Sequence, residues 1–116
     1  MSNITIYHNP KCSKSRQTLA LLNEQKIQPT IIEYLINTPT VSELKAILKK
    51  LNLKARDLLR KKEAEYKALN LADDSLNEDD LLKAMCQHPR LIERPIVVHG
   101  NKAVIGRPPE NVLEIL

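Results

Sequence analysis

The order of hydrophobic patterns in the first 36 residues limits the fold of this chain more than any other feature. Residues 4–7 (ITIY) alternate apolar and polar side chains, which is typical of a strand. Asn9-Pro10 indicates a turn, residues 13–25 have helical periodicity, and a second strand is expected over residues 30–36. Strand, helix and strand in this order predict two parallel strands joined by a right-handed crossover.

A second group of strands lies near the C-terminus. Residues 95–98 and 103–105 have strand patterns, and Gly100-Asn101 between them is a hairpin signal. Pro108-Pro109 precedes a short final helix over residues 110–116, because proline is favoured in the first helical turn. The second group therefore reads β-β-α.

The fifty or so residues between the two groups are helical in pattern. Thr40-x-x-Glu43 is a capping box and opens an amphipathic helix. One or two short helices are expected over residues 53–69. A further helix is expected to begin at Asn77, with acidic residues at 78–80, and to stop at His88-Pro89. No Gly/Ser-rich linker flanks this stretch. We therefore expect one domain over residues 1–116, with a helical insertion at about residues 40–90.

Composition narrows the functional classes. The 116 residues carry a net charge of +4, which suits an anionic small molecule or an acidic partner. Aromatic residues make up only 3%, too few for stacking on single-stranded nucleic acid. No apolar run reaches the ~20 residues of a membrane span, and the start lacks the pattern of a signal peptide. With only two cysteines, we expect a cytoplasmic protein with reduced thiols and no nucleic-acid or membrane partner.

Cys12 is the leading candidate for chemistry. It lies where the first helix is expected to begin, and helix N-termini and nearby cations lower the pKa of a thiol. The cations Lys11, Lys14 and Arg16 are close in sequence, and the free backbone N–H groups there can also bind an oxyanion. A buried structural cysteine is the alternative, but the basic neighbours favour a reactive thiol. Cys86 lies on an apolar helical stripe with Leu82 and Met85, so a core position is expected for it.

The residues around Cys12 exclude some chemistries. Position 15 is serine, so there is no Cys-x-x-Cys pair, and a resolving thiol has to come from Cys86 or from another molecule. Position 18 is threonine, so the Cys-x5-Arg loop of a tyrosine phosphatase is absent. His88 is expected at a helix end and His99 in an exposed hairpin. His8, four residues before Cys12, stays open as a partner of the thiol.

Four separated motifs resemble one known family. They are HNPKCSKSR at residues 8–16, RDLLRK at 56–61, IERPIVV at 92–98 and IGRP at 105–108. In this order they resemble the glutaredoxin-dependent arsenate reductase family (ArsC/YfgD type), whose superfamily includes the Spx-type transcription regulators. The resemblance implies an α/β thioredoxin-like fold, with a mixed four-stranded sheet and a helical insertion. It also implies a cis peptide bond before Pro95.

The resemblance further implies a mechanism. Cys12 attacks arsenate to form a thiol-arsenate adduct, which glutathione and glutaredoxin resolve to arsenite, an activity of arsenic resistance. Arg60, Arg94 and Arg107 match the family's substrate-binding arginines, and His8 matches a position that favours the Cys12 thiolate. Glutathione is then a co-substrate and glutaredoxin a partner, with no bound cofactor and no metal, and we expect a monomer.

The residues alone leave alternatives open. Each of the three arginines could be an ordinary surface cation, and Arg56 and Arg60 are spaced to share a helix face, so periodicity does not choose between them. A Spx-like regulatory protein that binds a polymerase subunit is one rival, although such proteins commonly carry Cys-x-x-Cys where this chain has Ser15. A thiol-dependent reductase or transferase acting on another electrophile is the other.

Overall fold

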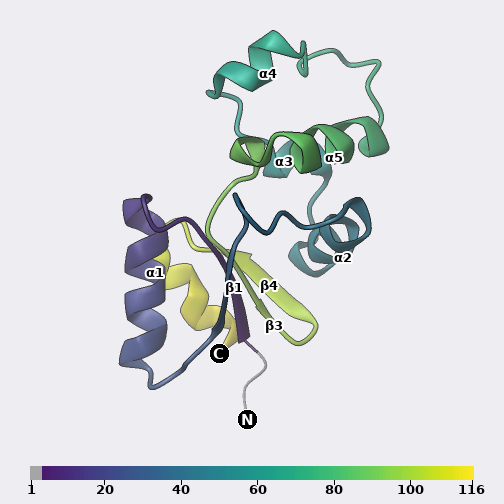
Figure 1. Ribbon diagram of the computed structural model, residues 1–116. Helices are drawn as coiled ribbons and strands as arrows, with labels where there is room; N and C mark the ends of the chain where they lie inside the picture. The colour runs from purple at the N-terminus through teal and green to yellow at the C-terminus, as the bar shows by residue number, and fades with distance from the viewer. Residues whose placement is uncertain (1–3) are drawn as a thin grey trace. The chain divides into compact units, whose positions relative to one another are not determined.

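The computed structural model describes residues 4–116 and divides them into two compact units (Figure 1). The first unit contains residues 4–37 and 94–116, and the second contains Thr38–Glu93. Every helix expected over about residues 40–90 lies in the second unit. That the two units form one domain stays a prediction. Residues 1–3 lie outside the described residues.

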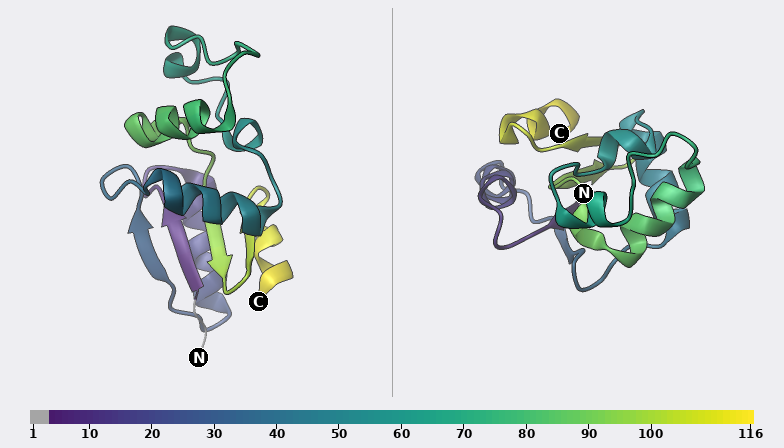
Figure 2. Two further views of the ribbon diagram at one scale, coloured as in Figure 1. Left: turned by 90° about the vertical axis from the view of Figure 1, so that its right-hand side faces the viewer. Right: turned by 90° about the horizontal axis from the view of Figure 1, so that it is seen from above.

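The first unit is built on one mixed sheet. Its strands are β1 (Ile4–His8), β2 (Thr30–Glu33), β3 (Ile96–His99) and β4 (Lys102–Ile105). They lie in the order β2-β1-β3-β4, with β1 parallel to β2 and antiparallel to β3, and β3 antiparallel to β4 (Figure 2). The expected four-stranded mixed sheet and the parallel pair around the first helix are confirmed.

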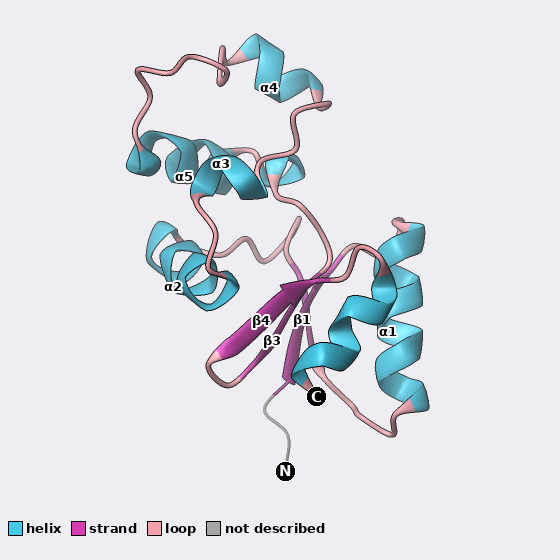
Figure 3. Ribbon diagram, turned by 180° about the vertical axis from the view of Figure 1, so that it is seen from behind, coloured by secondary structure: helices cyan, strands magenta, loops and turns pink. Residues whose placement is uncertain are grey.

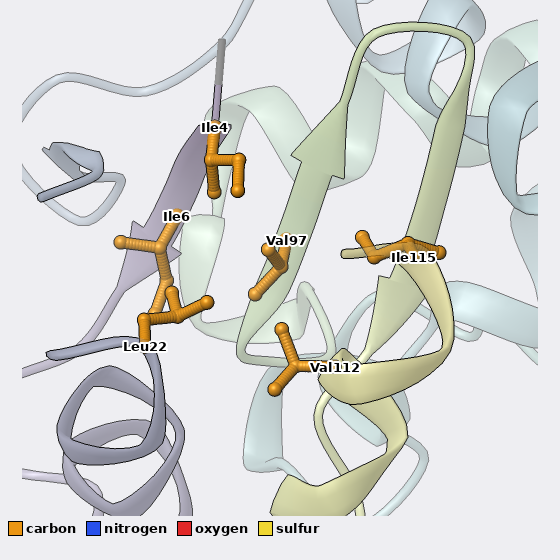
Figure 4. Close-up of a cluster of buried hydrophobic side chains, with 6 residues drawn as sticks. All are labelled: Ile4, Ile6, Leu22, Val97, Val112 and Ile115. Carbon is orange, nitrogen blue, oxygen red and sulfur yellow. The ribbon is translucent and has the colours of Figure 1, made fainter. Parts of the chain in front are cut away.

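Two helices cover one face of this sheet. They are α1 (Ser13–Glu24) and the 3-10 helix η2 (Pro109–Ile115), and they also contact each other (Figure 3). The alternation of β1 directs Ile4 and Ile6 to the same side, where they meet Leu22 of α1 (Figure 4). Val97, Val112 and Ile115 complete this buried cluster. This cluster is therefore wholly aliphatic, in a sequence without Phe or Trp.

Two boundaries differ from the sequence expectations. β2 ends at Glu33 rather than at residue 36, and the chain turns there, with the N–H groups of Ile36 and Asn37 donating to the Glu33 carbonyl. The physical reason is that β2 is an edge strand, and its partner β1 ends at His8, which is paired with Glu33. The last helix is a 3-10 helix that begins at Pro109.

The Arg94–Pro95 bond is cis as implied, and the Arg107–Pro108 bond is cis as well.

The second unit is helical. It contains α2 (Val41–Leu51), α3 (Ala55–Leu58), α4 (Ala64–Ala68), α5 (Glu78–Gln87) and the 3-10 helix η1 (Pro89–Leu91). The α5 helix packs against α2, α3 and η1. The capping box of α2 is confirmed, because the Glu43 N–H donates to Thr40 Oγ1 at 3.1 Å and the Thr40 N–H donates to Glu43 Oε1 at 3.2 Å.

Candidate active site

Cys12 occupies the N-cap position of α1, where the sequence places it. Its N–H donates to the Asn9 carbonyl at 3.0 Å, which closes the turn after β1, and its own carbonyl accepts from the Arg16 N–H at 3.0 Å. The thiol is free and partly exposed. A nucleophile at this point is accessible to a substrate and lies among the unpaired N–H groups of a helix start.

The surroundings of Cys12 favour its thiolate. Burial alone raises the pKa of the Cys12 thiol, but the backbone N–H of Ser15 and the charge of Arg94 lower it. The backbone N–H of Lys14 and the charge of Arg107 lower it further, so that the pKa of Cys12 lies below its ordinary value. Two backbone donors of α1 and two guanidinium groups therefore act on the same sulfur.

Arg107 donates a hydrogen bond to the sulfur of Cys12. Its Nη2 lies 3.8 Å from Cys12 Sγ, although the two residues are 95 positions apart in the sequence. Its Nε donates to the Arg94 carbonyl at 2.9 Å, which fixes the plane of the guanidinium. The structure thus brings together Cys12, Arg94 and Arg107, which the resemblance assigned to one site.

A close approach of backbone to helix positions Arg107. The Gly106 N–H donates to the Pro95 carbonyl at 2.9 Å. A Cβ atom at Gly106 would lie 2.5 Å from Thr18 Oγ1 and 2.9 Å from Pro95 Cγ, distances that real Cβ atoms do not adopt. Sequence reasoning missed both Gly106 and Thr18. A glycine directly before a candidate arginine was the available signal for such a close approach.

His8 contacts Ser15. It is a buried residue at the end of β1, and its Nδ1 lies 2.6 Å from Ser15 Oγ. Burial lowers the pKa of His8, the Glu33 carboxylate raises it and Arg16 lowers it, and the pKa lies below the ordinary histidine value. The neutral imidazole is therefore the favoured form at neutral pH.

The other basic residues of the loop have separate positions. Lys11 and Arg16 are exposed, and Arg16 Nη1 donates to the Pro10 carbonyl at 2.9 Å. Lys14 is half-buried, and its carbonyl accepts from Thr18 Oγ1 at 2.9 Å. Arg16 thus braces the turn that precedes Cys12.

Arg60 belongs to the second unit, where it contacts other charged residues. Its Nη1 lies 3.5 Å from Glu63 Oε1 and donates to the Arg90 carbonyl at 3.3 Å. The expectation that Arg56 and Arg60 share a helix face is wrong, since α3 ends at Leu58 and Leu59 leaves the helix to form a bridge with Ile92. Arg56 instead donates to the carbonyls of Leu71 and Asp73. A substrate-binding role for Arg60 stays a prediction.

Comparison with known proteins places these residues in a family context. The ArsC family matches this chain over residues 7–115. This chain belongs to the ArsC family. It is 54% identical to the Uncharacterized protein YfgD of Escherichia coli strain K12, over 97% of this chain and 96% of that protein. It is also 54% identical to a Haemophilus influenzae protein named arsenate reductase, over 98% of this chain and 99% of that protein.

Solved structures agree with this assignment. The structure titled arsenate reductase from Vibrio cholerae matches with a TM-score of 0.97 and 56% identity, covering 99% of this chain and 98% of that one. The likeness confirms the thioredoxin-like fold with a helical insertion that the four motifs implied.

Cys86 of this ArsC-family chain is in a different environment from Cys12. Its Sγ donates to the Pro39 carbonyl at 3.2 Å, and it is half-buried rather than part of the core. Burial raises the pKa of the Cys86 thiol, and the Glu43 carboxylate raises it further. The expected core position is therefore only partly met, because the thiol lies at the edge of the apolar stripe of α5.

The other two histidines, His88 and His99, lie at the ends of other elements. His88 caps the C-terminus of α5 as expected, but His99 is not exposed, since its Nδ1 contacts the Ile115 carbonyl.

Within residues 4–116, no group of three His, Cys, Asp or Glu side chains could hold a metal ion. Over the same residues no helix has the length and apolar character needed to cross a membrane.

Proposed function

We propose that this protein reduces arsenate to arsenite, with Cys12 as the nucleophile. The observation that carries the proposal is a thiol of lowered pKa at the start of α1, with Arg107 Nη2 at 3.8 Å from its sulfur. An oxyanion at this position meets cationic fork donors and free helix N–H groups while a thiolate lies beside its central atom. The arsenate reductase names of the Haemophilus and Vibrio relatives support the same substrate.

The proposed reaction begins at the sulfur. The Cys12 thiolate attacks the arsenic atom and forms a sulfur–arsenic bond. An arsenic–oxygen bond breaks, and the departing hydroxyl takes up a proton from solvent and leaves as water. Arg94 and Arg107 offset the negative charge of the oxyanion, since guanidinium groups remain charged and donate in a planar fork. The resemblance adds Arg60 as a third substrate-binding arginine. His8 completes the proposed catalytic set through its contact with Ser15.

The reducing electrons come from thiols outside this chain. Glutathione attacks the adduct and a glutaredoxin thiol completes the reduction, so that arsenic gains two electrons while these two thiols are joined in one disulfide. Water then breaks the sulfur–arsenic bond, which releases arsenite and restores the Cys12 thiol. Two features support an external thiol: a buried serine at position 15 where a dithiol enzyme has its second cysteine, and the raised pKa of Cys86. The proposal includes a monomer that acts in the cytoplasm in arsenic resistance, with glutathione as co-substrate and no bound cofactor.

A coupled assay tests the proposal. NADPH oxidation is followed with arsenate, glutathione, glutathione reductase and glutaredoxin. We expect Cys12→Ser to abolish the rate, because no other described thiol has both a lowered pKa and adjacent arginines, and Cys86→Ser to retain it. Arg60→Ala, Arg94→Ala and Arg107→Ala should each raise the KM for arsenate.

Other results of these assays contradict the proposal or indicate a different function. A silent wild-type enzyme at saturating arsenate contradicts the proposal. Loss of activity in a folded Cys86→Ser variant indicates an internal resolving cysteine. Turnover of a glutathione mixed disulfide without arsenate turnover indicates another electrophile, and polymerase binding without any turnover indicates the Spx-like alternative.

A further inference from the structure

A buried histidine–serine pair lies behind the active-site turn. Ser15 is 0% exposed and His8 is 7% exposed. Ser15 Oγ lies 2.6 Å from His8 Nδ1 and accepts a hydrogen bond from the Asn9 N–H at 3.0 Å. A buried hydroxyl left without partners costs about 1–3 kcal/mol, so the two contacts hold the Ser15 side chain in a single orientation.

The same pair ties the turn to the helix. Asn9 donates to Ser15 through its N–H, accepts from the Cys12 N–H at its carbonyl, and accepts from the Lys11 N–H at Oδ1, each at 3.0 Å. Ser15 therefore connects the end of β1 and the whole turn to the first turn of α1. Its backbone N–H is also the strongest of the groups that favour the Cys12 thiolate.

We propose that Ser15 is a positioning residue for the Cys12 thiolate and that His8 acts through it. The hydrogen bond between His8 and Ser15 orients the first turn of α1, so that the N–H groups of Lys14 and Ser15 face the sulfur. His8 contributes as a neutral hydrogen-bond partner and not as a cation. The inference depends on the proposed function only in taking Cys12 as the nucleophile.

The charges around His8 support its neutral form. Burial lowers the pKa of the imidazole; Arg16 on α1 lowers it too, and Glu33 on β2 opposes both. A neutral ring has no charge to offer a nearby thiolate. Its influence on Cys12 therefore has to pass through the hydroxyl that it contacts.

A double-mutant cycle tests this route. The ionisation of Cys12 is followed by the ultraviolet absorbance of its thiolate as pH is raised, in a Cys86→Ser background without arsenate. We expect His8→Ala and Ser15→Ala each to raise the midpoint by about one pH unit, a tenfold loss of thiolate below the midpoint. The double variant should shift no further than the larger single shift.

Two results would overturn the inference. One is a His8→Ala shift of equal size in the wild-type and Ser15→Ala backgrounds, which means that His8 acts on the sulfur directly. The other is a folded Ser15→Ala variant with the wild-type midpoint. Since the titration contains no arsenate, failure of the proposed reductase activity leaves this test unaffected.

Two further variants separate positioning from folding. His8→Asn keeps a polar group at the place of Nδ1 and should titrate as the wild type does, whereas His8→Leu should titrate as His8→Ala does. If Ser15→Ala does not fold, the inference is still overturned when His8→Asn and His8→Leu give the same Cys12 titration midpoint. His99→Ala is the matched control. Like His8, His99 is the last residue of a strand and has an Nδ1 contact, here with the Ile115 carbonyl. It pairs with Ile4, at the opposite end of β1 from His8.

Discussion

At the scale of single residues, the two cysteines show how environment decides reactivity. Cys12 lies at a helix start with two arginine charges acting on it, and its pKa is lowered although burial opposes this. Cys86 donates to a carbonyl and has a carboxylate nearby, and burial raises its pKa. The surroundings therefore favour the reactive thiolate at Cys12 and the neutral thiol at Cys86.

This contrast predicts a difference in alkylation. Iodoacetamide should modify Cys12 at least about tenfold faster than Cys86 at neutral pH, because the thiolate is the reacting form. Since the Cys12 pKa is lowered, its rate should persist to more acidic pH and fall only as pH drops through that pKa. Peptide mass spectrometry after timed quenching measures both rates. Equal rates, or faster modification of Cys86, would contradict the assignment of the thiols.

At the scale of elements, the segment after β4 is held against α1 by a glycine. Gly106 fits between Thr18 and Pro95, and its neighbour Arg107 then reaches the sulfur. Asn111 of η2 also donates to the Arg107 carbonyl at 3.2 Å. The position of the guanidinium thus depends on the packing of three elements rather than on the arginine alone.

Gly106→Ala should displace Arg107 and lower kcat/KM for arsenate by about tenfold or more, because small displacements at a reacting centre are costly. It should also raise the Cys12 midpoint in the thiolate titration. Gly100→Ala is the matched control. Gly100 has φ +61, and a Cβ atom added there would have nothing within 4 Å. The Gly100→Ala substitution should therefore cost about 1 kcal/mol of stability and leave the kinetics unchanged. Wild-type kinetics for Gly106→Ala would refute the positioning role.

At the scale of the whole molecule, each of the two units has its own buried apolar residues, and the groups that shift the Cys12 pKa lie in the first. The first unit packs Leu22 of α1 against β1, β3 and η2. In the second unit α5 contributes Leu82, which is 1% exposed. The chemistry of the thiol and the packing of the second unit are thus expected to respond to different substitutions.

Leu22→Ala and Leu82→Ala should each lower the free energy of unfolding by about 2–5 kcal/mol, since each leaves a buried cavity. Leu82→Ala should do so without shifting the Cys12 titration of the folded protein. Leu113→Ala, at a residue 45% exposed, is the control and should stay within about 0.5 kcal/mol of wild type. Chemical denaturation followed by circular dichroism gives the free energies, and a Cys12 shift in Leu82→Ala would show coupling between the units.

Local patterns determined much of this protein. The alternation in residues 4–7, the Thr40–Glu43 capping box and the Gly100-Asn101 hairpin each predicted an element that the structure contains. The position of Cys12 at a helix start was predicted in the same way. These features depend on residues within about four positions of each other, so neighbouring side chains and backbone propensity suffice to fix them.

Only the tertiary structure decided the contacts that build the site. Arg107 reaches a sulfur 95 positions away, Ser15 binds His8 across the turn, and Gly106 lies against Thr18. Arg60 does not lie on the helix face that periodicity predicted, because the helix ends before it and Leu59 forms a bridge with Ile92. Such contacts follow from the register of the strands and the close packing of distant segments, which no local pattern contains. The sequence alone placed the thiol at a helix start, and the fold supplied the groups that lower its pKa.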